Sequence, residues 1–247
     1  MATTTDWLVR KPIAHRGLHS GDSECPENSL KAFERAMRKG LPFELDVHLL
    51  LDGHVCVFHD SNTKRMTGIN RSIKELSYRD IKQMPLLESD QKIPLLEEVL
   101  SLIQGKVPIL VEIKNRGEIG PLESACFKLL SKYRGNYAVV SFNPQTLHWF
   151  RKNFPEALRG QLAGEFKDKT VPMFRKMLLK NLLYNGISKP HFIGYDVKYL
   201  PNIKVALHRK RGIQIIGWTV RSFEELISVR SFCDNIVFEG LDPEVLY

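Results

Sequence analysis

The feature that most constrains the fold is a regular alternation of strand-like and helix-like segments along almost the whole chain. Apolar segments typical of strands cover residues 12–15, 43–49, 108–114, 137–142, 159–164, 192–197, 214–220 and 235–239. Segments with apolar residues at helical spacing lie between them, beginning near residues 29, 124, 144, 172, 201 and 222. A strand followed by a helix, repeated about eight times, is the pattern of a (β/α)8 barrel. We therefore predict an α/β fold of the TIM-barrel class.

One stretch departs from this alternation. Between Asp60 and Leu95 a polar, helix-prone sequence replaces the expected strand-helix unit, and residues 72–84 carry apolar side chains at helical spacing. We predict a single domain over residues 1–247 with a small inserted segment, residues 61–94, which leaves the barrel beside His59 and is placed to form one wall of a site there. A surface excursion that only connects two strands is the alternative for that segment.

Composition permits one sizeable core and excludes several classes of function. The chain has 247 residues, of which 43% are hydrophobic. Its net charge of +8 attracts anions, but it has no dense basic stripe, so we predict no nucleic-acid binding. No signal pattern or apolar run of membrane-spanning length is visible, which predicts no stable membrane insertion. The four cysteines lack zinc-ligand spacing, so we expect free thiols and a cytoplasmic location.

Two histidines and two acids lie at or near the ends of strand candidates. His15 ends the first strand candidate, and His59 ends an additional one at residues 54–59. Glu44 and Asp46 are two residues apart on a strand, so both side chains point to one face and offer two oxygen ligands. Because (β/α)8 barrels build their active sites at the carboxyl ends of strands, we expect these groups to lie in one site.

Glu112 and Lys114 end another strand candidate and also share a face. Glu112 can join the two acids as a third oxygen ligand, and Lys114 can reach a phosphate oxygen. A hard divalent cation beside two imidazoles indicates metal-assisted attack on a phosphate ester. One imidazole would take a proton and the other would donate one.

The basic residues and histidines also have purely structural explanations. A lone histidine at a strand end is more often a hydrogen-bonded structural residue, but two of them beside three acids favour chemistry. Arg16 could merely neutralise Glu27 or Glu44, and its approach to a phosphate requires the chain to turn at Gly17. Lys114 could be a simple surface charge.

Two further residues leave alternatives open. Asn28 could be the N-cap of the helix that follows, with Ser29 as the other cap candidate, or it could contact a metal. Trp218, at the end of a strand candidate, could line a pocket or only fill the core.

The chain resembles the glycerophosphodiester phosphodiesterases in an ordered set of short motifs. The motifs are His15-Arg16-Gly17, Pro26-Glu27-Asn28-Ser29, Glu44-Leu45-Asp46, Asp52-Gly53, His59-Asp60, residues 94–100 and Glu112-Ile113-Lys114, with a weaker echo in Ser141-Phe142 and Trp218-Thr219-Val220. Each motif is weak alone, but the ordered set is strong. The resemblance implies an irregular (β/α)8 TIM barrel with a small insertion after the second histidine, and residues 61–94 fit that insertion.

The resemblance also implies an activity, namely hydrolysis of a small-molecule glycerophosphodiester to sn-glycerol 3-phosphate and an alcohol. The roles it implies are one Mg2+ or Ca2+ held by Glu44, Asp46 and Glu112, an acid and base pair in His15 and His59, phosphate contacts from Arg16 and Lys114, and an alcohol pocket lined by Trp218. Which histidine is the acid stays open, as do the preferred alcohol and the oligomeric state.

Two departures from the family pattern bear on substrate preference. His48-Leu49-Leu50-Leu51 replaces a usual threonine before the acidic turn, and Phe238-Glu239-Gly240 replaces a usual Thr-Asp. The alternatives are therefore a phosphodiesterase for sugar phosphodiesters or lysophospholipids, and a catalytically silent barrel that binds phosphodiesters. Release of glycerol 3-phosphate, measured with and without EDTA, would separate an enzyme from a silent barrel.

Overall fold

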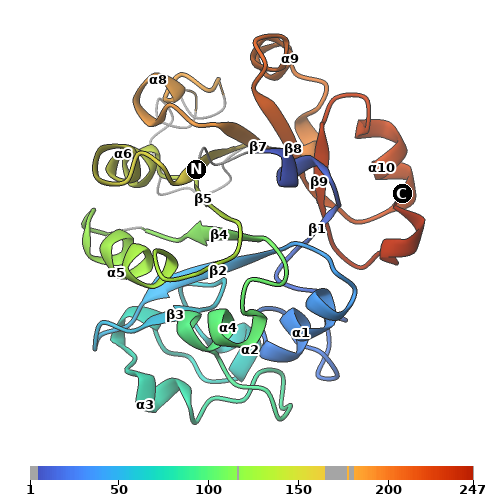
Figure 1. Cartoon of the computed structure of the whole chain (residues 1–247). Coiled ribbons are helices and arrows are strands. Elements are labelled where there is room, and N and C mark those ends of the chain that lie inside the picture. The colour runs from blue at the N-terminus through green and yellow to red at the C-terminus, as the bar shows by residue number, and fades with distance from the viewer. Residues whose placement is uncertain (1–4, 116, 165–176, 178–180, 247) are drawn as a thin grey trace. The chain divides into compact units, whose positions relative to one another are not determined.

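The computed structural model describes residues 5–115, 117–164, 177 and 181–246 and divides into two compact units. The first unit, here the N-terminal unit, is Ile13–Tyr137. The second, here the C-terminal unit, is Met1–Pro12 together with Ala138–Tyr247. Figure 1 shows the helices and strands of both, coloured from blue at the N-terminus to red at the C-terminus.

The N-terminal unit consists of strands, α-helices and one 3-10 helix. Its elements are β1 (Ile13–Ala14), α1 (Leu30–Arg38), β2 (Phe43–Leu49), β3 (Val55–Val57), α2 (Lys64–Thr67), η2 (Ile73–Glu75), α3 (Tyr78–Ile81), α4 (Leu96–Ile103), β4 (Ile109–Ile113) and α5 (Pro121–Leu130). Strand β2 pairs in parallel with β1 and with β4, and antiparallel with the additional strand β3. The β2–β4 register sets Asp46 opposite Glu112.

Helix α1 forms where the sequence supplies both a cap and an apolar face. The Ser29 hydroxyl accepts a hydrogen bond from the backbone N–H of Ala32 at 3.1 Å, which satisfies one of the free donors of the first turn. Phe33 is fully buried and stacks on Phe43 of β2, with ring centroids 4.7 Å apart. Packing of α1 against β2 therefore fixes the loop that joins β1 to α1.

The inserted stretch packs its apolar side chains into one cluster with residues at and around β3. Its buried side chains include Met66, Ile73 and Leu76, which form one cluster with Phe58. Residues 72–84 do not form one helix, as their spacing suggested, but two short ones, η2 and α3. The helix is interrupted because Ser77 is extended and caps α3, with its hydroxyl accepting from Asp80 N–H and the Asp80 carboxylate accepting from Ser77 N–H.

The C-terminal unit alternates strands and helices. Its elements are η1 (Asp6–Val9), β5 (Tyr137–Ser141), α6 (Pro144–Asn153), β6 (Leu158–Ala163), α8 (Asn185–Ser188), β7 (Phe192–Asp196), η3 (Val197–Tyr199), α9 (Ile203–Lys210), β8 (Gln214–Val220), α10 (Phe223–Val229), β9 (Asn235–Phe238) and η4 (Pro243–Val245). Strands β5 to β9 pair in parallel in chain order. The helix predicted from Pro172 lies mostly outside the described residues.

Of the nine strands in the described residues, eight follow the predicted alternation, and the fold class is the predicted (β/α)8 barrel with β3 as an extra strand. Helices α4 and α8 were not predicted.

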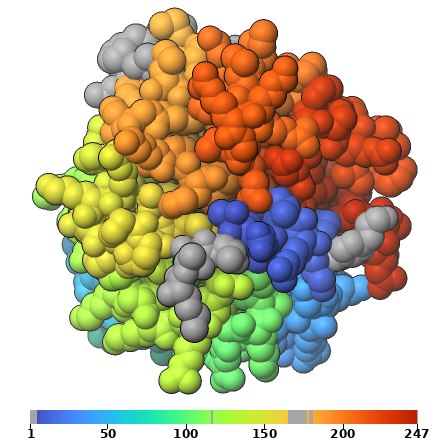
Figure 2. All heavy atoms as spheres, turned by 45° about the horizontal axis from the view of Figure 1, so that its top comes forward, coloured from blue at the N-terminus to red at the C-terminus, as the bar shows by residue number. Residues whose placement is uncertain are grey.

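Helix α9 lies at the surface of its unit, in the orange part of Figure 2, and the exposed fraction of Ile203 on it is 74%. Among the described residues, no helix is long and apolar enough to cross a membrane.

Candidate active site

The turn after β1 aims two of the predicted site residues. Strand β1 ends at Ala14, and beyond His15 the residues Arg16 and Gly17 both have positive φ angles, +52° and +80°. The turn at Gly17 that an inward-facing Arg16 requires is therefore present. The Arg16 backbone N–H donates to Glu44 Oε2 at 3.1 Å, and His15 Nε2 lies 3.9 Å from the same oxygen.

Gly17 is required at this turn for two reasons. Its φ of +80° is unfavourable for residues with a Cβ, and an added Cβ would lie 2.9 Å from both the backbone C and the Cβ of Ala32 on α1. At Gly53, which also has a positive φ, an added Cβ would meet nothing within 4 Å. Gly53 is therefore a control that isolates the backbone strain from the clash.

We expect Gly17→Ala to lower the free energy of unfolding by roughly 2–5 kcal/mol, the sum of the left-handed backbone strain and the overpacking against α1. Gly53→Ala should cost only the strain, about 1–2 kcal/mol. Urea unfolding of both variants measures the difference. Equal losses in the two variants would show that α1 yields to the added methyl group.

Three buried carboxylates meet where β2 and β4 lie side by side. Glu44, Asp46 and Glu112 each offer an oxygen within 4.8 Å of the others, and their exposed fractions are only 5%, 0% and 8%. Burial, followed by repulsion from Asp46 and Glu112, raises the pKa of Glu44 well above its ordinary value. Three buried carboxylates this close together require nearby positive charge, because unpaired buried charges are energetically costly.

Lys114 supplies part of that charge. Its Nζ forms ion pairs with Asp46 Oδ1 at 2.9 Å and with Glu112 Oε1 at 2.8 Å. Burial alone would raise the pKa of Asp46, but Lys114, the largest of the opposing influences, helps hold it below its ordinary value. Burial still raises the pKa of Glu112, with Asp46 adding to the rise, although Lys114 opposes it. The donor set of three hard oxygens fits Mg2+ or Ca2+.

His59 follows β3 and is held by its neighbour in the chain. Its Nδ1 lies 2.6 Å from Asp60 Oδ1. His48 Nε2 lies 3.2 Å from the His59 backbone oxygen, and burial lowers the pKa of His48 to about 4. His48 is therefore neutral and donates to that oxygen, and this hydrogen bond holds the backbone of His59 in place.

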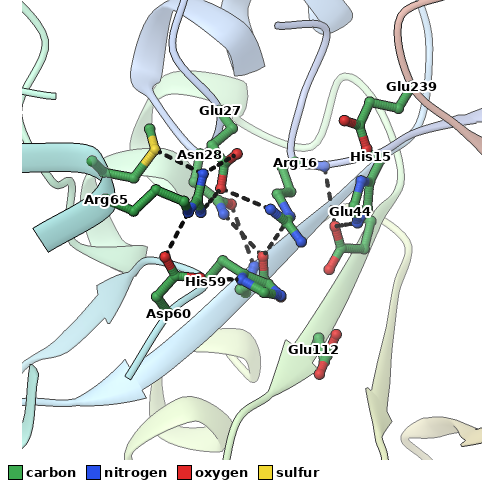
Figure 3. A network of polar contacts seen from close by, with 12 residues as sticks. His15, Arg16, Glu27, Asn28, Glu44, His59, Asp60, Arg65, Glu112 and Glu239 are labelled. Carbon is green, nitrogen blue, oxygen red and sulfur yellow. Dashed lines mark hydrogen bonds and ion pairs between the residues drawn. The ribbon is translucent and has the colours of Figure 1, made fainter. Parts of the chain in front are cut away.

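Arg16 joins the acidic cluster to a further acid, Glu27. Its NH1 donates to Glu27 Oε1 at 2.8 Å, and its Nε lies 3.4 Å from Asp46 Oδ2. Asn28 is not the helix cap, because Ser29 takes that position. The Asn28 side chain instead donates from Nδ2 to Asp46 Oδ2 at 2.9 Å. Figure 3 shows Arg16, Glu27 and Asn28 around this part of the site.

A cavity of about 640 Å3 opens beside His59. Residues that line it include His59, Asp60, Lys64, Arg65 and Lys114. Lys64 and Arg65 come from the inserted segment, so this segment contributes to the wall of the cavity. The lining residues are polar or charged and include several cationic side chains, which suits a small anionic or polar ligand.

Trp218 lies on β8 of the C-terminal unit. It packs edge-on against Phe142, with ring centroids 5.4 Å apart, and it is only partly buried. At the end of β9, Glu239 pairs with Arg221 at 2.9 Å.

The structure brings the N-terminal predicted residues together and adds several that were not predicted. His15, Arg16, Glu44, Asp46, His59, Glu112 and Lys114 all lie in the N-terminal unit. Asp60 and Arg65 were given no role from the sequence, and Glu27 was considered only as a possible partner of Arg16, which it is in the structure. Asp60 adjoins His59, which is a usable signal, whereas Arg65 stands among many charged residues of a polar stretch and carries no such signal.

The chain is similar in sequence to several known proteins. The sequence profile of the glycerophosphoryl diester phosphodiesterase family matches residues 15–233. A glycerophosphodiester phosphodiesterase of Caldanaerobacter subterraneus is 30% identical over 246 residues, with 95% of each chain covered. A human lysophospholipase D is 32% identical over 262 residues, with 88% of this chain and 79% of that protein covered.

Solved structures share the fold. A phosphodiesterase of Oleispira antarctica, in complex with the product sn-glycerol-3-phosphate, has a TM-score of 0.80 at 21% identity over 97% of this chain and 96% of that one. A glycerophosphodiester phosphodiesterase of Thermotoga maritima has a TM-score of 0.72 at 26% identity, with 95% and 94% covered.

Proposed function

The chain belongs to the glycerophosphoryl diester phosphodiesterase family, and on that premise we propose a metal-assisted hydrolysis of glycerophosphodiesters by two histidines. The products are sn-glycerol 3-phosphate and an alcohol. The observation that carries the proposal is the convergence of three buried acids with Lys114 and Arg16, and of His59 with Asp60, in one unit. The same convergence supports an active enzyme over a silent binding barrel.

One divalent cation, Mg2+ or Ca2+, would be held by Glu44, Asp46 and Glu112. Their buried, mutually repelling carboxylates fit a hard cation, since Arg16 and Lys114 together still leave the pKa of Glu44 well above its ordinary value. When bound, such a cation polarises a phosphoryl oxygen and eases deprotonation of the attacking hydroxyl.

The remaining residues of the site bind phosphate and move protons. Arg16 and Lys114 would stabilise the negative charge that grows on the phosphoryl oxygens, because both are cations that already face the acids. His15 and His59 would act as an acid and base pair. In His59 the hydrogen bond to Asp60 fixes the proton on Nδ1, so Nε2 is the nitrogen that exchanges a proton with the substrate.

Three further predictions accompany this function. We propose that Trp218 lines the pocket for the alcohol, supported by its partly exposed ring at β8. We also keep a single domain over residues 1–247, with residues 61–94 as its inserted segment. The four cysteines are all free and buried, which supports the proposed cytoplasmic location.

A lysophospholipid is the second candidate substrate, because the chain is 32% identical to a human lysophospholipase D. The test is a panel of glycerophosphodiesters and lysophospholipids, with release of glycerol 3-phosphate or of the free alcohol measured for each. We expect the highest kcat/KM with a deacylated glycerophosphodiester, since the residues that line the cavity beside His59 are polar or charged. Faster cleavage of a lysophospholipid would reverse the assignment, and no cleavage of any member would refute the proposed function.

A further inference from the structure

Arg65, on α2 of the inserted segment, joins two acidic residues of the site. Its Nε donates to Asp60 Oδ2 at 2.7 Å. Its NH2 and NH1 donate to the two oxygens of Glu27 at 2.7 and 3.0 Å. Figure 3 shows Arg65 between these carboxylates. The guanidinium therefore uses three nitrogens on two acids, which a lysine could not reproduce.

The position of Arg65 is set by the packing of α2. The next residue, Met66, is 2% exposed and lies in the apolar cluster that the inserted segment shares with Phe58. Thr63 accepts a hydrogen bond from Thr67 N–H through its backbone oxygen, and Gly68 ends the helix in the left-handed region. Arg65 itself is 47% exposed, so its reach toward the site depends on this anchored turn and on the two carboxylates.

The Asp60 contact extends to His59. Asp60 uses Oδ1 to accept from His59 Nδ1 at 2.6 Å and Oδ2 to accept from Arg65 at 2.7 Å, so both of its oxygens are held. The hydrogen bond from His59 is the largest influence that lowers the pKa of Asp60, and the one from Arg65 adds to it. Without Arg65, the carboxylate loses one of its two fixed partners and can turn about its own bond. The orientation of the His59 ring would then be set by one hydrogen bond alone.

The contact with Glu27 holds the NH1 and NH2 groups of the Arg65 guanidinium. Glu27 accepts from Arg16 at 2.8 Å as well as from Arg65, so it is fixed from two sides. Burial disfavours the charged form of Glu27, but the hydrogen bonds from Arg65 and the charge of Arg16 outweigh it and lower the pKa. Glu27 thus stays ionised and anchors the guanidinium beside Asp60.

We infer that Arg65 is a positioning residue for His59, acting through Asp60, and that the inserted segment supplies it to the site. The inference rests on the proposed role of His59 in proton transfer. It gives residues 61–94 a task in the reaction beyond lining the cavity. Arg65 does not need to touch the substrate for this task.

A double-mutant cycle tests whether Arg65 acts through His59. We expect Arg65→Met to lower kcat roughly 10-fold or more, a usual loss when the outer partner of a functional histidine is removed, with a smaller change in KM. In a His59→Ala background the same substitution should change kcat less than about twofold, because the residue it orients is gone. Arg71→Met is the matched control. Arg71 also pairs with an acid of the inserted segment, Asp80 at 3.0 Å, and is similarly exposed, so we expect an unchanged kcat.

Equal losses in both backgrounds would overturn the inference and leave Arg65 with a structural role only, and so would an unchanged kcat in Arg65→Met. A second readout does not depend on activity. NMR of the histidine ring protons should show a hydrogen-bonded Nδ1 proton, assigned by its absence in His59→Ala, which is weakened or lost in Arg65→Met and kept in Arg71→Met. If the wild-type chain cleaved no glycerophosphodiester, the proposed function would fail. The NMR signal would still decide the positioning role, and an unaltered signal in Arg65→Met would refute it.

Discussion

Removing divalent cations from the purified chain should lower the release of sn-glycerol 3-phosphate by roughly 1000-fold, and adding Mg2+ or Ca2+ should restore it. The magnitude follows from the several kcal/mol of charge stabilisation that a metal ion supplies to a phosphoryl group. It also follows from the acids themselves. Without a cation, Glu44, Asp46 and Glu112 would repel each other at oxygen separations within 4.8 Å.

The measurement combines turnover after EDTA treatment with the metal content of the same sample and with calorimetric titration of Mg2+ and Ca2+. Asp46→Asn should weaken cation binding, because it removes the charge of the most buried acid of the three. Asp80→Asn is a suitable control, since Asp80 is paired with Arg71 in the inserted segment and lies outside the acidic cluster. Full turnover in a sample shown to hold no metal would exclude the metal role of the three acids.

The spacing of acids on strands was predictable because side chains alternate along a strand. Glu44 and Asp46 share a face of β2 for that reason, and the parallel β2–β4 register sets Glu112 opposite Asp46. His48 follows the same rule, being two residues beyond Asp46. The fold class was predictable on similar grounds, since the alternation of strands and helices is visible in the hydrophobic pattern of the whole chain.

Contacts across the inserted segment were not predictable. Arg65 and Glu27 are 38 positions apart, and no periodicity links them. The direction of Arg65 depends on a helix of four residues, α2, whose place is fixed by Met66 in the apolar cluster that the inserted segment shares with Phe58. Residues 72–84 show the same limit, because apolar residues at helical spacing fit two short helices as well as one. The capping residue Ser77 decided between them.

The backbone conformation at the start of α1 was also not predictable from the sequence pattern. Asn28 and Ser29 are both good caps, and the sequence alone does not choose between them. In the structure Ser29 is extended and caps the helix, whereas Asn28 has a φ of +55° and turns its side chain to Asp46. Asparagine tolerates this left-handed conformation better than most residues, which leaves the cap to its neighbour.

His15→Ala and His59→Ala should each lower kcat by roughly 100-fold or more, the usual contribution of a positioned acid or base. KM should change less, because Arg16 and Lys114 are the proposed phosphate contacts and remain in place. The measurement is turnover of a glycerophosphodiester with a poorly leaving alcohol. His54→Ala is a matched control, since His54 is exposed in the same unit and its ring contacts Tyr78. A variant of either site histidine with near wild-type turnover would remove that residue from the chemistry.

The leaving group also decides which histidine is the acid. A poorly leaving alcohol needs a proton as its bond to phosphorus breaks, whereas 4-nitrophenol departs without one. On the 4-nitrophenyl ester of glycerol 3-phosphate, loss of the acid should therefore lower kcat much less than it does on the glycerophosphodiester. Loss of the base should lower kcat by about the same factor on both substrates. Of His15→Ala and His59→Ala, one should therefore keep much more of the wild-type kcat on the 4-nitrophenyl ester than on the glycerophosphodiester, and the other should not. If both did, or neither did, His15 and His59 would not divide the two proton transfers between them.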